Sequence, residues 1–81
     1  GKNCIINTNS TIEHDVVIGD NCHIAGGAVI NGSVTILSGT FIGSGAVIKQ
    51  GVMVGKNCII PANVFVRKNV KNNKTFIEEK N

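Results

Sequence analysis

Branched aliphatic residues recur at every sixth position over most of the chain. This column consists of Ile6, Ile12, Ile18, Ile24, Ile30, Ile36, Ile42, Ile48, Val54, Ile60 and Val66. A second column, two residues earlier, holds small or β-branched residues: Cys4, Ser10, Val16, Cys22, Ala28, Val34, Thr40, Ala46, Val52, Cys58 and Val64. A six-residue period predicts a parallel β-solenoid, in which each coil buries its inward columns against the neighbouring coils.

A third column, three residues after each aliphatic, contains residue types that tolerate a positive φ angle. Its members are Asn9, Asp15, Asn21, Gly27, Ser33, Gly39, Gly45, Gly51, Asn57, Asn63 and Asn69. Short extended segments would therefore alternate with turns that each need one left-handed residue. With three repeats in each triangular coil, the eleven repeats predict an all-β solenoid of three to four coils.

The repeats divide the chain into an array and a tail. Residues 1–71 form one array, and the pattern fails at Asn72, which stands where the next aliphatic would be. We expect residues 72–81 to form a C-terminal cap or tail. Phe76 and Ile77 are available to fold back over the last coil, and the last two residues, Lys80 and Asn81, are expected to fray.

The start of the array and two interior positions are unusual. Cys4 is already in register, so we expect either that an N-terminal region of a longer chain is absent or that a partner covers this end. Leu37 and Pro61 follow an aliphatic where small residues are usual. Leu37 is either a subunit contact or sequence drift. Pro61 lacks a backbone donor, and we expect it to weaken pairing between coils.

Composition limits the possible functions of this 81-residue chain, whose net charge is +3. There is no apolar run long enough to span a membrane and no signal-peptide pattern. Cys4 and Cys22 would stack on adjacent coils about 4.8 Å apart, but their parallel Cβ vectors disfavour a disulfide. Free thiols and a cytoplasmic location are therefore expected. No CxxC motif or Cys/His cluster indicates a metal site.

Charge is uneven along the chain. Six basic residues and no acidic residue lie between positions 49 and 74: Lys49, Lys56, Arg67, Lys68, Lys71 and Lys74. This segment is either a solvated surface or a site for an anionic ligand such as a phosphate-bearing cofactor. Nucleic acid is not an expected partner, because the chain has no Trp or Tyr to provide a stacking platform.

The two histidines are the main candidates for chemistry. His14 and Asp15 share one turn, and His23 follows nine residues after His14. Because nine residues make half a coil, the two histidines would lie on different sides of one chain. A site that uses both must then lie between two chains, and a threefold arrangement would provide three equivalent sites.

Because eighteen residues make one coil, Gly32 would lie on His14 in the next coil, with Gln50 and Lys68 in the coils beyond it. A glycine in a turn presents an unobstructed backbone N–H close to the imidazole. Acyl transfer needs this combination of a base for the nucleophile's proton and a donor for the developing oxyanion. The period alone favours an ordinary exposed histidine in a turn.

Two segments make the sequence resemble a known family. Residues 7–15 (NTNSTIEHD) and 18–24 (IGDNCHI) resemble the hexapeptide-repeat acyltransferases. More narrowly, they resemble the branch of sialic acid O-acetyltransferases and nucleotide-linked amino-sugar N-acetyltransferases. The resemblance implies a left-handed parallel β-helix, a homotrimer, and acetyl-CoA as acetyl donor to a sugar amine or hydroxyl. The N-terminal sugar-nucleotide-binding domain usual in this branch is not in the sequence.

The resemblance also implies roles for individual residues. His14 would be the general base, oriented by Asp15. The backbone N–H of Gly32 would face the thioester carbonyl, and His23 would contact acetyl-CoA bound with a neighbouring subunit.

Three further positions are expected to bind ligands. The match of Asn7 implies a polar contact on the acceptor side of the cleft, and Glu13 belongs to the same polar turn cluster. Gly43 would line the pantetheine arm of the acyl donor. The alternative function is a non-catalytic trimerisation or spacer module of a larger protein. A zinc hydratase on a similar solenoid would require a third histidine.

Overall fold

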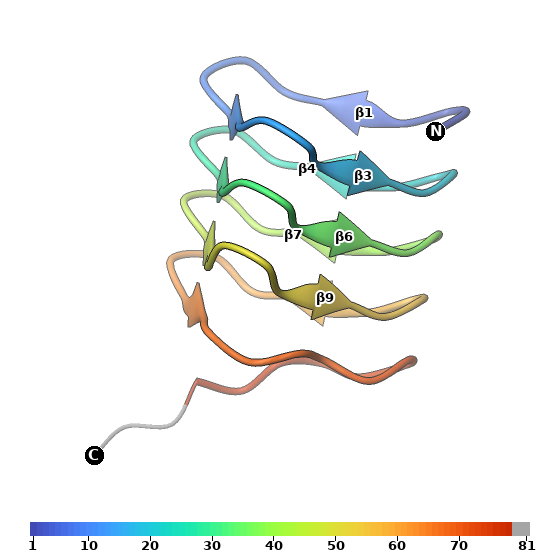
Figure 1. Cartoon of the computed structure of the whole chain (residues 1–81), viewed down its shortest axis with the longest axis vertical. Helices are drawn as coiled ribbons and strands as arrows, with labels where there is room; N and C mark the ends of the chain where they lie inside the picture. The colour runs from blue at the N-terminus through green and yellow to red at the C-terminus, as the bar shows by residue number, and fades with distance from the viewer. Residues whose placement is uncertain (79–81) are drawn as a thin grey trace.

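The computed structural model describes residues 1–78 as a stack of parallel β-coils without a helix (Figure 1). The predicted all-β solenoid is therefore confirmed, and the stacking is consistent with a left-handed β-helix. Each of the eleven strands contains two residues: β1 (Ile5–Ile6), β2 (Thr11–Ile12), β3 (Val17–Ile18), β4 (His23–Ile24), β5 (Val29–Ile30), β6 (Thr35–Ile36), β7 (Phe41–Ile42), β8 (Val47–Ile48), β9 (Met53–Val54), β10 (Ile59–Ile60) and β11 (Phe65–Val66).

The strands form the three sides of a prism. Sheet A has the order β1-β4-β7-β10, sheet B has the order β11-β8-β5-β2, and sheet C has the order β3-β6-β9. Every pairing is parallel with an offset of eighteen residues, as in the pairing of Ile6 with Ile24. The offset brings equivalent positions of successive coils into register, so each column of the sequence becomes a ladder along the prism.

The second residue of each strand points into the prism. The aliphatic side chains are completely buried from Ile24 through Val66. Ile6 and Ile12 remain 50% and 37% exposed, because only one neighbouring coil covers them. The inward columns predicted from the period therefore form the core, and burial increases away from the N-terminal coil.

The predicted left-handed positions are confirmed at ten of the eleven sites, from Asn9 to Asn63. The prediction for Asn69 is wrong: the last described residue with a positive φ is Asn73, at 61°. The physical reason is a change in register, because Val70 bridges Val54 and Thr75 bridges Ile59 at offsets of sixteen residues. The turn after β11 is thus two residues shorter than the others.

Side-chain amides replace backbone groups where the register changes. The Oδ1 atom of Asn69 accepts the Met53 N–H at 2.8 Å, and that of Asn72 accepts the Lys56 N–H at 2.7 Å. Asn69 is therefore used as an acceptor and not as a turn residue.

The tail covers the last coil only in part. Phe76 is half-buried against the core, as expected, whereas Ile77 is 81% exposed and does not fold back. The expected fraying of Lys80 and Asn81 concerns residues outside the described part of the chain. No helix in residues 1–78 is long and apolar enough to cross a membrane.

Pro61 leaves the pairing of its coil with the preceding coil intact. The Gly43 N–H still donates to the Ile60 carbonyl at 2.7 Å, so β7 and β10 remain paired. Each coil donates N–H groups at this position to the next coil, and β10 is the last strand of sheet A. The missing donor of Pro61 falls on the C-terminal side, where the bridge between Ile59 and Thr75 is not continued as a strand, in keeping with the expected weaker pairing.

Candidate functional site

His14 lies in the turn between β2 and β3, where sheet B meets sheet C. Asp15 adopts the left-handed conformation (φ 58°), and its Oδ2 atom lies 3.2 Å from Nδ1 of His14. A carboxylate accepts the proton of Nδ1, which leaves the lone pair on Nε2. Both side chains are largely exposed, 72% and 81%, so the pair adds little to stability. Its main effect is to fix the tautomer and orientation of the imidazole.

Gly32 lies against this imidazole on the next coil. A Cβ atom at Gly32 would stand 2.9 Å from both Cε1 and Nε2 of His14. The ring thus occupies the space that any other residue would fill. The neighbouring Ser33 N–H donates to the His14 carbonyl at 3.0 Å, which joins the two turns. No backbone carbonyl within residues 1–78 accepts the Gly32 N–H, so this donor is available to a ligand.

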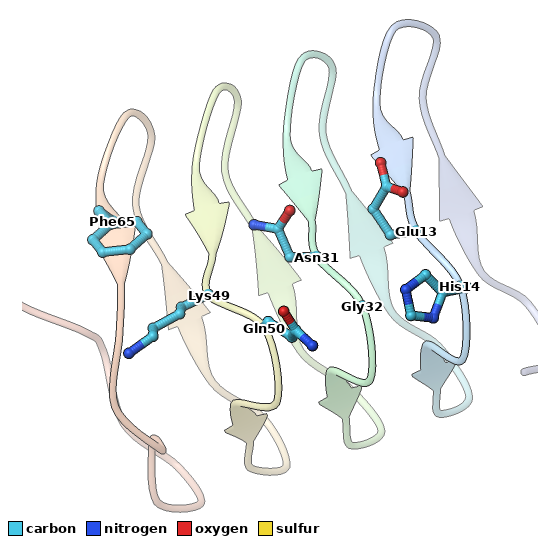
Figure 2. A pocket seen from close by; sticks show the side chains of 7 residues that line it. All are labelled: Glu13, His14, Asn31, Gly32, Lys49, Gln50 and Phe65. Carbon is cyan, nitrogen blue, oxygen red and sulfur yellow. The ribbon is translucent and has the colours of Figure 1, made fainter.

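An open groove of about 440 Å³ begins at His14 and runs along the prism (Figure 2). Its lining residues follow β2, β5 and β8 or lie on β11: Glu13, His14, Asn31, Gly32, Lys49, Gln50 and Phe65. The groove therefore crosses four successive coils along the edge of sheet B, and all of its residues except Phe65 come from positions that the eighteen-residue offset superimposes.

The chemistry of the groove changes along its length. Glu13 and His14 lie at the N-terminal end, whereas Lys49 and Phe65 lie toward the C-terminal end (Figure 2). Between them, the amide of Asn31 donates to the Ile48 carbonyl at 2.9 Å and is held in place. An elongated ligand would meet an acid and a base at one end, and a cation and an aromatic ring at the other.

The other predicted residues lie on and beside sheet A. His23 begins β4 and pairs with Ile5 and Phe41 on the adjacent strands. The Nδ2 atom of Asn7 is 3.3 Å from Nε2 of His23. Gly43 follows β7 and is buried; a Cβ there would come within 2.6 Å of the backbone of the next coil.

The predicted site residues thus separate into two groups within one chain. The first group lies at the junction of sheets B and C: Glu13, His14, Asp15 and Gly32. The second group lies on or next to sheet A: Asn7, His23 and Gly43. This separation agrees with the half-coil arithmetic. A single site that uses both groups needs two chains.

Sequence reasoning missed part of the groove and misplaced one member. Phe65 lines the groove, whereas Lys68, expected to continue the stack of His14, Gly32 and Gln50, does not. The two-residue shortening after β11 ends the stack before Lys68 is reached. The outward position of Phe65 on β11 follows from the period, but no repeating residue type marks that position as part of a groove.

The described part of the chain was also compared with the requirements of a metal site. Within residues 1–78, no three His, Cys, Asp or Glu side chains are grouped so that they could hold an ion.

Comparisons with known proteins agree with the repeat. The family model "Bacterial transferase hexapeptide (six repeats)" matches residues 1–32 and 33–68. The structure is similar to the acetyltransferase domain of PglB from Neisseria gonorrhoeae FA1090, with a TM-score of 0.81 and 30% sequence identity. The similarity covers 83% of this chain and 33% of that one, so the chain spans about a third of its length. No curated protein sequence matches the chain. From the two matched segments, which together include most of its residues, the chain belongs to the bacterial hexapeptide transferase family.

Proposed function

We propose that this chain transfers an acetyl group from acetyl-CoA to an amine or hydroxyl of a sugar. The family and the acetyltransferase neighbour support an acyltransferase. The observation that carries the more specific proposal is the arrangement of Asp15, His14 and Gly32, which combines an oriented base with a free backbone donor. A spacer module would not need these groups at one point.

In the proposed reaction, Nε2 of His14 removes the proton of the acceptor as its nitrogen or oxygen attacks the thioester carbon. The Gly32 N–H stabilises the oxyanion, a contribution of about 3 kcal/mol for one such donor. The carbon–sulfur bond then breaks, and coenzyme A leaves as the thiol with the proton from His14. Asp15 keeps the imidazole in the tautomer that this step requires.

A covalent acyl-enzyme is not part of the proposal. The thiols of Cys22 and Cys58 are buried, and that of Cys4 donates inward to the Gly19 carbonyl at 3.0 Å. The Ser10 hydroxyl donates to the Asn7 carbonyl at 2.6 Å. Within residues 1–78, no cysteine, serine or threonine lines the groove, which favours direct transfer.

The site would be shared between chains of a homotrimer. Hexapeptide-repeat transferases generally form trimers, and in the proposed trimer the sheet A side of one chain would lie next to the groove of another. His23 and Gly43 of the neighbouring chain would then bind the acyl donor, while Asn7 and Glu13 would face the acceptor. Lys49 is positioned for an anionic part of a ligand such as a phosphate.

The direct test measures release of free thiol from acetyl-CoA, with amino sugars, nucleotide-linked amino sugars and sialic acids as separate acceptors. We expect release with one acceptor class and loss of at least about a hundredfold in the His14→Gln variant, since general-base catalysis contributes about that much. Lys56→Gln, at an exposed turn away from the groove, is the control. A trimeric wild-type chain without release for any acceptor would favour the spacer function.

A further inference from the structure

The imidazole of His23 is held by a neighbour on the previous coil. The Nδ2 atom of Asn7 lies 3.3 Å from Nε2 of His23. An amide nitrogen can only donate, so Nε2 must accept. A neutral imidazole carries one proton, and an accepting Nε2 places that proton on Nδ1.

Phe41 restrains the same ring from the next coil. It pairs with His23 across β4 and β7, and the two ring centroids are 5.1 Å apart at an interplanar angle of 81°. This edge-to-face geometry is favourable for aromatic rings. The imidazole is therefore restrained by Asn7 on one coil and by Phe41 on another.

The second ring nitrogen of His23 has no protein partner. Among the hydrogen bonds of residues 1–78, none involves Nδ1 of His23. The side chain is only half-buried, so the Nδ1–H is accessible from outside the prism.

We propose that Asn7 is a positioning residue that, together with Phe41, holds His23 as a hydrogen-bond donor toward the acyl donor. The consequence for catalysis rests on the proposed function. Asn7 then acts on the acyl donor through His23. The group best suited to the Nδ1–H is an acceptor oxygen, such as an amide or thioester carbonyl of the acyl donor.

The two histidines therefore have opposite tasks because they have opposite partners. In His14 the carboxylate of Asp15 takes the Nδ1 proton and leaves Nε2 as a base. In His23 the amide of Asn7 occupies Nε2 and leaves Nδ1 as a donor. A carboxylate at position 7 would reverse the tautomer of His23.

The test is ¹⁵N NMR of the imidazole rings in the assembled chain at a pH where both histidines are neutral. We expect wild-type His23 to show protonated Nδ1 and unprotonated Nε2. Asn7→Asp is expected to exchange these two signals, and Asn7→Ala to give a mixture of tautomers. The signals of His14 should stay unchanged in both variants, and Asn72→Asp, which keeps its acceptor oxygen, is the matched control.

A wild-type His23 protonated at Nε2, or a tautomer that does not respond to either substitution, would overturn the proposal. A kinetic readout adds the functional consequence: Asn7→Asp should raise the KM for acetyl-CoA about three- to tenfold, the effect of one hydrogen bond, with a smaller change in kcat. An unchanged KM would contradict the donor role. Because the NMR signals do not depend on turnover, an inactive wild-type chain would count against the proposed function alone.

Discussion

At the scale of single residues, the imidazole of His14 has room next to Gly32 because glycine has no Cβ atom. The glycine does not adopt a positive φ, so its backbone conformation is open to other residues. What excludes a side chain is the imidazole, 2.9 Å from the Cβ position. Under the proposed function, Gly32 is therefore needed by the candidate site and not by the fold.

Gly32→Ala separates these two requirements. We expect an unchanged melting temperature, because the exposed imidazole can move aside, and a fall in kcat/KM of about a hundredfold, the cost of a misplacement of about 1 Å. Thermal unfolding and acetyl-transfer kinetics measure the two effects. Full activity in this variant would show that the position of the ring over Gly32 is not needed. The control is Gly26→Ala, since Gly26 does not contact His14.

Cys22 gives a prediction about pH. Burial raises the pKa of the Cys22 thiol above its ordinary value of 9.0. At pH values between the two pKa values, the Cys22 thiol thus keeps its proton in the folded chain and loses it in the unfolded chain. The associated stability is complete below pH 9 and is lost as pH rises through the higher pKa of the folded state.

We therefore expect the free energy of unfolding to fall more steeply above pH 9 in the wild type than in Cys22→Ser. The serine keeps a donor for the Leu37 carbonyl, the bond that Sγ makes at 3.2 Å. Denaturant unfolding across this pH range measures the difference. Parallel curves for the two chains would contradict the prediction.

At the scale of the repeating element, the side chains of one core column donate hydrogen bonds to the backbone. In the column of Cys4, Cys22, Thr40 and Cys58, each thiol or hydroxyl donates to a backbone carbonyl where sheet C turns into sheet A. The accepting carbonyls receive no backbone N–H within residues 1–78: Gly19, Leu37, Gly55 and Lys71. The sequence suggested compact apolar side chains at this column, but the structure shows donors that satisfy buried carbonyl groups.

Thr40 provides the sharpest test of this column. Its hydroxyl donates to the Gly55 carbonyl at 2.6 Å and accepts the Cys58 N–H at 3.0 Å. Thr40→Val has a similar shape but leaves both groups unpaired, and we expect a loss of about 2–4 kcal/mol in the free energy of unfolding. Thr40→Ser keeps the hydroxyl and should lose less. Equal losses would show that packing, not hydrogen bonding, determines this position.

The period predicted these elements because burial and turn geometry repeat with it. Buried side chains stand at every sixth position, and left-handed residues follow them up to Asn63. The failure at Asn69 has a local cause: Val70 takes the bridge position opposite Val54 two residues early. The sequence marks the change only in part: Val70 is aliphatic and Asn72 is not, but an asparagine at position 69 is equally suited to a turn and to accepting a backbone N–H.

The part of the candidate site that depends on the stacking of coils was predictable from the sequence. The eighteen-residue offset places Gly32 next to His14, and both are found together. The contact between Asn7 and His23 joins residues sixteen positions apart and depends on side-chain rotamers, which the period does not specify. The groove wall at Phe65 was missed for a different reason, because outward positions carry no periodic constraint on residue type.

At the scale of the whole molecule, the proposed function requires that one site be built from two chains. Within one chain, His14 lies at the junction of sheets B and C, and His23 lies on sheet A. A chain with His14→Ala lacks the base, and a chain with His23→Glu has an anion where the acyl donor should find a hydrogen-bond donor. Each variant should be inactive alone while still forming trimers.

The most direct measurement mixes these two inactive chains, dissociates and reassembles them, and assays acetyl transfer. In a random mixture of equal amounts, about a quarter of the sites combine an intact His14 with an intact His23 of the adjacent chain. We predict that about this fraction of wild-type activity returns. Mixed trimers that form but remain inactive would contradict a site shared between chains.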